Sequence, residues 1–187
     1  MPVMARKNLS CIILAGGEGR RAGGADKGLL CLHGKPLVEH VIDSVRHQVD
    51  DIVISANRNI DSYQAYDYKV VRDSSDSCMG PLAGIHACLE HCNHEQVLVV
   101  PCDMPHLPHD LVQQMQIDNA YSVTVVQCMG RYQLVLSINR NCSSSISSAL
   151  RSDERSLMKW VKQQQHKVSV IDKAELFTNL NHGLVEL

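Results

Sequence analysis

The chain has 187 residues, of which 44% are hydrophobic, 4% are aromatic and 20% are charged, and its formal net charge is −2 at pH 7. This length suits one domain, covering residues 1–187, with an aliphatic core. The charge excludes the basic footprint of a nucleic-acid-binding protein, and no apolar run approaches the roughly 18 residues that cross a membrane. Residues 1–8 lead into a short apolar run that ends in glycine, which makes a poor signal peptide, so we expect a cytoplasmic location.

The first predicted strand, Cys11–Leu14, opens into a glycine-rich loop that continues to Gly28. Because glycine has no side chain, the backbone N–H groups of such a loop can approach a ligand, and concave runs of N–H groups bind phosphate. Arg20, Arg21 and Lys27 add positive charge that also suits phosphate. A surface loop without a ligand is the alternative, but glycine and charge together favour a phosphate site.

Two familiar phosphate-binding motifs do not fit this loop. Gly17–Ala22 matches the G-x-G-x-x-A dinucleotide pattern, but Gly23 and Gly24 follow where that motif needs a helix. No acidic residue ends a clear second strand about 20 residues on, so we reject a nicotinamide-type site. The P-loop pattern is also absent, because Pro36 follows Gly34-Lys35 and has no hydroxyl for Mg²⁺.

Strand and helix patterns alternate along the first two-thirds of the chain. The predicted strands after the loop are 51–55, 69–72, 96–101, 121–127, 132–138 and 167–171, with 29–32 a short strand or extended segment and 177–181 an extended tail. The predicted helices are 36–48, a short helix near 63–66, 79–92 with a proline near its start, 108–115, 143–151 and 156–164. The alternation predicts an α/β fold, a three-layer α/β/α sandwich around a mostly parallel sheet.

Polar residues follow the carboxyl ends of several predicted strands, where ligands bind in open sheets of this type. The glycine loop, Ser55–Asn57, Asp73 and Asp103 all stand at such ends, and we expect them to converge on one edge. Asp103 is a predicted magnesium ligand, since Mg²⁺ takes one or two carboxylates together with phosphate oxygens and water. It could instead cap the next helix, but Pro105 and Pro108 delay that helix.

Eight cysteines are many for this length, and none forms a C-x-x-C pair. His86, Cys88, His91, Cys92 and His94 form one cluster, in which the two cysteines are four residues apart on a predicted helix. Structural zinc sites usually draw paired ligands from separate elements at tighter spacing. We therefore favour a buried helix face with exposed histidines over a zinc site.

Residues 14–27 match L-A-G-G-x-x-x-R-x-G-G-x-D-K, which resembles the signature loop of nucleotidyltransferases that act on phosphorylated acceptors. The form Gly23–Leu29 is most similar to the molybdenum cofactor guanylyltransferases, although Ala22 stands where members often carry Met. The resemblance covers nearly the whole chain, with its specific motifs in residues 12–105. It implies a Rossmann-like nucleotidyltransferase fold and Mg²⁺-dependent transfer of GMP from GTP to the phosphate of molybdopterin cofactor, giving the guanine dinucleotide cofactor and pyrophosphate.

The resemblance also implies roles for individual residues. Arg21, Lys27 and Asp103 are the implied catalytic residues, with Asp103 the metal ligand. The implied nucleotide-binding residues are Leu14, Ala15, Gly16, Gly17, Lys27, Ser55, Asn57, Asp73, Gly80 and Asp103. The family's N-A-N-R segment reads Ser55–Arg58 here, so its first Asn is replaced while Asn57 and Arg58 match.

Some of these implied contacts have competing interpretations. Asp73 can accept hydrogen bonds from the guanine N1–H and amine or hold the ribose, or it can simply begin a turn. The Asn57 amide can donate and accept, as a base or ribose edge requires. Gly80 precedes a helix whose N-terminus favours an anion, unless this is an ordinary proline-started helix. The acceptor side corresponds more loosely, through Arg131, Arg155 and Asn179-x-Asn181.

The implied partners are GTP, molybdopterin or molybdenum cofactor, cofactor-insertion proteins and recipient molybdoenzymes, and not nucleic acid or a membrane. A cytidylyltransferase acting on the same pterin and a sugar-1-phosphate nucleotidyltransferase remain alternatives, because the loop alone permits all three. The Gly-Gly-x-Asp-Lys-Gly form and the short chain favour the guanylyl reaction. A non-catalytic pterin carrier is a further alternative, but it would not need Lys27 or Asp103.

Overall fold

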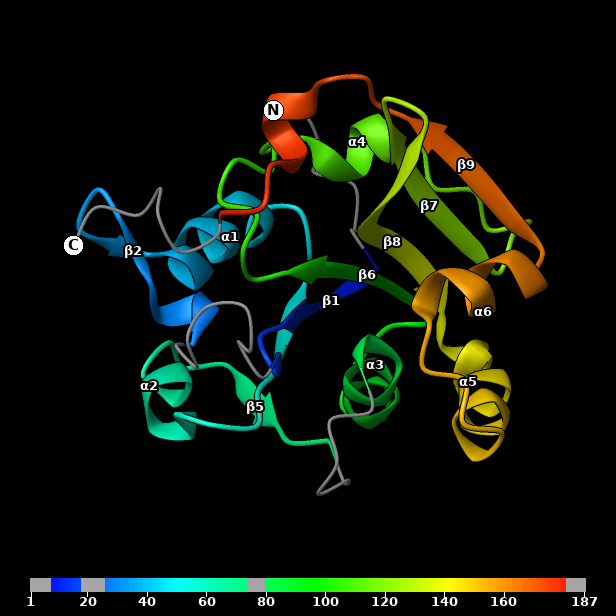
Figure 1. Ribbon diagram of the computed structural model, residues 1–187, viewed down its shortest axis with the longest axis horizontal. Coiled ribbons are helices and arrows are strands. Elements are labelled where there is room, and N and C mark those ends of the chain that lie inside the picture. The colour runs from blue at the N-terminus through cyan, green and yellow to red at the C-terminus, as the bar shows by residue number, and fades with distance from the viewer. Residues whose placement is uncertain (1–7, 18–25, 74–79, 181–187) are drawn as a thin grey trace.

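The computed structural model describes residues 8–17, 26–73 and 80–180 (Figure 1). Its main sheet contains β1 (Leu9–Leu14), β4 (Asp51–Ser55), β5 (Lys69–Val71), β6 (Gln96–Pro101), β7 (Val123–Cys128), β8 (Arg131–Asn139) and β9 (His166–Val170), and a small sheet pairs β2 (Cys31–Leu32) with β3 (Lys35–Pro36). The α-helices are α1 (Leu37–Val45), α2 (Ile60–Gln64), α3 (Pro81–Leu89), α4 (Leu111–Met115), α5 (Ser143–Arg151) and α6 (Leu157–Gln163). Short 3₁₀ turns cover Lys27–Leu29, Arg140–Cys142 and Ala174–Phe177.

The main sheet has the strand order β5-β4-β1-β6-β8-β7-β9. Strand β8 is antiparallel to both of its neighbours, and the remaining pairs are parallel. This arrangement confirms the predicted mostly parallel sheet. The antiparallel hairpin of β7 and β8, also expected from the sequence, places the second half of the sheet beside β6.

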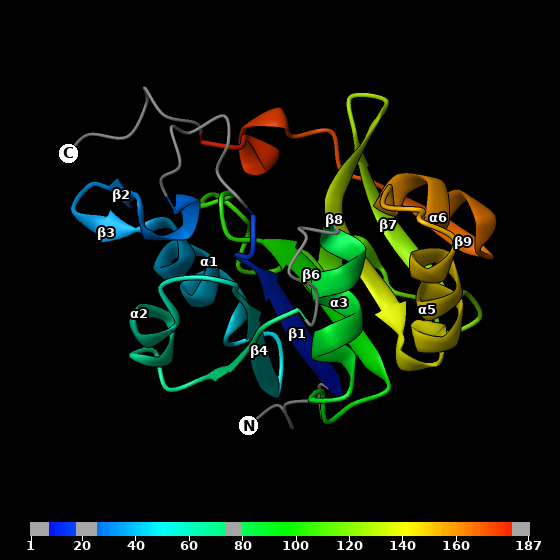
Figure 2. The same cartoon turned by 60° about the horizontal axis from the view of Figure 1, so that its bottom comes forward.

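Two aliphatic cores cover the two faces of this sheet. The apolar strands alternate between them: Ile12 and Val99 contact the core that contains α3, α5 and α6, whereas Ile13 and Val100 contact the core that contains α1 and α4. A strand buried on both faces reads as a continuous apolar run, as β1 and β6 do. Figure 2 shows α3, α5 and α6 together on one side of the sheet. The predicted three-layer α/β/α sandwich is therefore confirmed.

Several element boundaries differ from the predictions. Helix α1 ends at Val45 instead of near Gln48, α3 ends at Leu89 instead of near Cys92, and α4 begins at Leu111 instead of Pro108. The segment expected as an extended tail begins with the last residue of a 3₁₀ turn, Ala174–Phe177. Among residues 8–17, 26–73 and 80–180, no helix has both the length and the apolar character to cross a membrane.

Candidate active site

The carboxyl ends of the four parallel strands β5, β4, β1 and β6 lie in register. Leu14 pairs with Ser55 on one side and Pro101 on the other, and Ser55 pairs with Val71. Two further backbone bonds continue the pairing beyond the strands, from Ala15 N–H to the Ser55 carbonyl and from Cys102 N–H to the Leu14 carbonyl. The residues that follow each strand are therefore brought to one edge.

A cavity of about 590 Å³ lies at this edge. It is lined by Leu14, Ala15, Gly16, Gly17, Lys27, Ser55, Asp73, Gly80, Pro81, Gly84, Pro101, Cys102, Asp103, Leu134, Arg155 and Asn179. Every predicted nucleotide-binding residue except Asn57 is in this lining. Arg21 and Asn181 lie outside the described residues, and Arg131 is exposed at the β7–β8 turn, away from the lining.

Lys27 and Asp103 meet inside the cavity although 76 positions separate them in the sequence. The Lys27 ammonium donates to Asp103 Oδ2 at 3.1 Å, and the two side chains are 28% and 11% exposed. Asp103 Oδ1 makes no hydrogen bond with the described residues. The Asp103 backbone carbonyl accepts a hydrogen bond from Leu180 N–H. This bond attaches the last described residue of the chain next to Asp103.

The site at Lys27 and Asp103 supplies only some of the ligands that a hard cation such as Mg²⁺ requires. A carboxylate oxygen is a ligand that Mg²⁺ prefers, and Asp103 Oδ1 is available for one. Within the described ranges, no group of three or more His, Cys, Asp or Glu residues gathers to hold a metal. A magnesium ion at Asp103 would therefore take its remaining ligands from substrate phosphates and water, which is how Mg²⁺ is usually bound.

Asp26, the residue before Lys27, holds the turn that carries Lys27 in place. The sequence analysis assigned Asp26 no role of its own. Its side chain is only 5% exposed. Oδ1 accepts from the Tyr63 hydroxyl at 2.6 Å and from Gly28 N–H at 3.2 Å, while Oδ2 accepts from Asn59 Nδ2 at 3.0 Å. The bond to Gly28 caps the 3₁₀ turn that carries Lys27, so the anchor fixes the position of the lysine.

We expect Tyr63→Phe to lower the free energy of unfolding by about 1–3 kcal/mol, because it leaves a buried carboxylate with one donor fewer. Burial, with the nearby Cys102 thiol and Asp26 carboxylate, raises the pKa of Tyr63 well above its ordinary value, so the phenol stays a donor at neutral pH. Urea denaturation measures the change. The control is Tyr66→Phe, because the Tyr66 hydroxyl makes no hydrogen bond with the described residues. Equal stability of the two variants would contradict the anchor.

Arg58 links the two described residues that flank segment 18–25. Its Nη2 donates to the Gly17 carbonyl at 3.2 Å, and its Nε lies 3.8 Å from Asp26 Oδ2. Arg58 belongs to the predicted Ser55–Arg58 segment. Arg58 therefore contacts Gly17 and Asp26, on either side of segment 18–25. The segment Ser55–Arg58 thus supports the glycine loop in addition to ending β4.

Helix α3 approaches the cavity through glycine. A Cβ on Gly84 would lie 2.6 Å from Ser55 Oγ and 3.3 Å from Leu14 Cδ2, so only glycine permits this contact with the ends of β1 and β4. Gly80, with φ of 77°, precedes Pro81 at the helix start, and both line the cavity. The predicted proline-started helix therefore presents its N-terminus to the site.

Gly84→Ala is expected to lower the free energy of unfolding by about 1–3 kcal/mol, since the added methyl group overpacks the helix–strand contact. The combined variant Gly84→Ala with Ser55→Ala is expected to recover part of this loss, because the hydroxyl nearest to the new Cβ is gone. Chemical denaturation of the wild type, both single variants and the double variant gives the coupling energy. Strictly additive effects would show that Gly84 is not constrained by Ser55.

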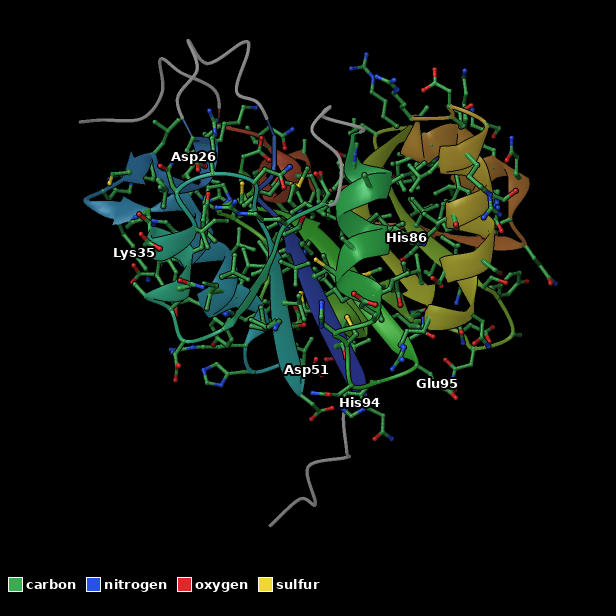
Figure 3. The ribbon with its side chains drawn as sticks, turned by 90° about the horizontal axis from the view of Figure 1, so that it is seen from below. Asp26, Lys35, Asp51, His86, His94 and Glu95 are labelled. Atoms are coloured by element: carbon green, nitrogen blue, oxygen red, sulfur yellow. The ribbon has the colours of Figure 1, made fainter. Side chains whose placement is uncertain are left out.

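None of the cysteines and histidines of this cluster is in the cavity lining. Cys88 and Cys92 are buried, and burial raises the pKa of each thiol to about 12, so neither is a nucleophile at neutral pH. His86, His91 and His94 are half-buried instead of exposed as predicted. Figure 3 places His94 with Asp51 at the end of the molecule opposite Asp26. Its contacts, 3.4 Å to Asp50 and 3.7 Å to Asp51, therefore belong to the far edge of the sheet.

Comparisons with known proteins give a consistent picture. The family model "MobA-like NTP transferase domain" matches residues 11–168. The chain is 36% identical to the molybdenum cofactor guanylyltransferase of Shewanella putrefaciens, covering 93% of this chain and 92% of the relative. It is 38% identical to that of Yersinia pestis strain Pestoides F, with 93% and 91% covered.

Solved structures show the same fold. Molybdopterin-guanine dinucleotide biosynthesis protein A from Archaeoglobus fulgidus superposes with a TM-score of 0.75 at 20% identity, covering 93% of each chain. The 4-diphosphocytidyl-2C-methyl-D-erythritol synthase from Anaerococcus prevotii has a TM-score of 0.72 at 14% identity, covering 94% of this chain and 93% of the other. Structural likeness at these identities establishes the fold alone.

Proposed function

This chain belongs to the molybdenum cofactor guanylyltransferase family, and we propose that it transfers GMP from GTP to the phosphate of molybdopterin cofactor. The observation that carries the proposal is the Lys27–Asp103 pair inside a cavity built from the ends of β1, β4, β5 and β6. A nucleotidyltransferase must hold polyphosphate, a divalent cation and an acceptor together. The cavity brings a cation, a carboxylate and glycine backbone to one place.

The chemistry is an in-line displacement at phosphorus. A phosphate oxygen of the acceptor forms a bond to the α-phosphorus of GTP, and the bond between that phosphorus and the bridging oxygen to the β-phosphate breaks. The electron pair of the broken bond leaves with pyrophosphate. The chain's own residues need no covalent role, because positioning and charge screening supply most of the rate of such reactions.

Each side chain at the site has a proposed part in this reaction. Lys27 neutralises charge that develops on the polyphosphate, while Leu14–Gly17 bring the backbone against the nucleotide. Asp103 would hold Mg²⁺, which would supply screening of the phosphate charges. Arg21 is the proposed second cation of the glycine loop. Asp73 and Ser55 contact the nucleoside, and Gly80 provides the helix start.

The acceptor side is proposed to lie at Leu134, Arg155 and Asn179, which complete the lining from the second half of the chain. Arg155 supplies a cation for the pterin phosphate. The product passes to cofactor-insertion proteins and recipient molybdoenzymes. We place this reaction in one catalytic domain, residues 1–187, in the cytoplasm. The free state of all seven cysteines within the described residues fits a reducing compartment.

Calorimetric binding of GTP, CTP, UTP and ATP, each with and without Mg²⁺, tests the nucleotide assignment. We expect GTP to bind at least about tenfold more tightly than the other three, a difference of roughly 1.4 kcal/mol. A preference for CTP or UTP would assign the chain to a related transferase activity. If none of the four nucleotides bound but molybdopterin did, the chain would be a pterin carrier instead of a transferase.

A further inference from the structure

Asn57 and Asp73 form a reciprocal pair at the ends of two neighbouring strands. Asn57 follows β4 and Asp73 follows β5. Asn57 Nδ2 donates to Asp73 Oδ2 at 2.9 Å, and the Asp73 backbone N–H donates to Asn57 Oδ1 at 3.1 Å. The backbone bond from Ala56 N–H to the Val71 carbonyl holds the two segments side by side.

The Asn57 amide bonds a residue of the cavity lining without being part of that lining. Asn57 is absent from the cavity lining, although Gly16, Ser55 and Asp73 are present. A Cβ on Gly16 would lie 3.2 Å from Asn57 Nδ2, so the amide packs closely against Gly16. Asn57 therefore stands beside the cavity lining, next to Gly16 and Asp73, which are part of it.

Asp73 has one oxygen that the described residues do not satisfy. Its Oδ1 is buried and has no hydrogen-bond partner within the described ranges, whereas Oδ2 accepts from Asn57. A buried acceptor without a donor costs about 1–3 kcal/mol. Such groups are rare in native proteins and indicate a partner beyond the described residues. Asp73 lines the cavity, so a ligand bound there would lie next to this carboxylate.

We propose that Asn57 is a positioning residue, which fixes the Asp73 carboxylate so that Oδ1 accepts a hydrogen bond from the nucleoside of GTP. The inference rests on the proposed function and adds to it how the nucleoside is read. Without Asn57, the Asp73 side chain can rotate, and ordering it again on binding would reduce affinity. The donor is an N–H of guanine or an O–H of ribose, and nucleotide analogues distinguish these sources.

The test compares Asn57→Ala with Asn93→Ala, an exposed asparagine whose side chain makes no hydrogen bond with the described residues. We expect Asn57→Ala to raise the Kd for GTP on the order of tenfold and to change kcat at saturation by less than about threefold, because one charged hydrogen bond is weakened. Asn93→Ala is expected to match the wild type. Thermal unfolding of each variant shows whether it remains folded.

Four analogues identify the group that is read. Inosine triphosphate lacks the amine, 1-methylguanosine triphosphate lacks N1–H, and 2′-deoxy and 3′-deoxy GTP each lack one hydroxyl. The analogue without the recognised donor is expected to bind wild type and Asn57→Ala equally, while the others keep the full difference. An equal loss for GTP and all four analogues would overturn the inference, since a merely structural role predicts that result.

If Asn57→Ala is unstable, exchanging the side chains at positions 57 and 73 provides a second test. Asn57→Asp alone places two carboxylates together, whereas Asn57→Asp with Asp73→Asn restores a donor–acceptor pair. The double variant is expected to bind GTP more tightly than Asn57→Asp, and equal binding would overturn the inference.

If wild type shows no Mg²⁺-dependent preference for GTP, the proposed function fails. If wild type shows it but Asn57→Ala binds all ligands normally, only the positioning role fails.

Discussion

Asp103→Asn is expected to reduce kcat for nucleotidyl transfer on the order of 10²–10³-fold, as removal of one preorganised electrostatic group does in other enzymes. The substitution keeps the side chain's size but removes the charge that pairs with Lys27 at 3.1 Å and would hold Mg²⁺. Steady-state release of pyrophosphate measures the effect. The Mg²⁺ concentration for half-maximal activity is expected to rise in the same variant.

Asp110→Asn is the matched control for this prediction. Asp110 lies in the same stretch of chain, but it is exposed and hydrogen-bonds only Gln114 among the described residues. Its kcat is expected to equal that of the wild type. If Asp103→Asn kept kcat within about threefold of wild type, Asp103 would have no part in transition-state stabilisation.

Lys27→Ala is the second change with a large expected effect, a loss of about 10²-fold or more in kcat/KM. The Lys27 side chain is 28% exposed in the cavity, and its ammonium is held there by the Asp26 anchor and by Asp103. Lys27→Arg is expected to recover little activity, because a planar guanidinium does not fit the position of a compact ammonium. Steady-state kinetics with GTP as the varied substrate measures kcat and KM separately.

Lys35→Ala provides the control for charge alone. Lys35 pairs with Asp43 and Glu39 on α1, outside the cavity lining. Its kinetics are expected to match the wild type. Equal losses in Lys27→Ala and Lys35→Ala would show that overall charge, and not the position of Lys27, supports catalysis.

Local pattern was enough to predict most elements of the fold. Strands β4 and β6 and helix α5 have the predicted bounds, because their apolar residues and flanking residues already specify them. The end of α1 was not predictable in this way. Gln48 bonds the Ser44 and Pro108 carbonyls and the Val112 N–H, so it joins α1 to α4 across 64 positions. That contact depends on how the helices pack, which periodicity does not reveal.

The site was predicted to the level of which residues converge, but not how they contact one another. The rule that ligands bind beyond strand ends placed Ser55, Asp73 and Asp103 together. The pairing of Asn57 with Asp73 needs β4 beside β5, and strand order is not visible in a single sequence. Asp26 is similar: its neighbours Asn59 and Tyr63 come from another segment, so its role as an anchor appears only in the folded chain.

The most direct measurement is transfer of label from α-³²P-GTP to molybdopterin cofactor by the purified protein with Mg²⁺. The account predicts a labelled guanine dinucleotide form of the pterin and an equal amount of pyrophosphate, with both lost in Asp103→Asn. Labelled product from CTP but not GTP would contradict the guanylyl assignment. Release of pyrophosphate without label on the pterin would contradict the proposed acceptor.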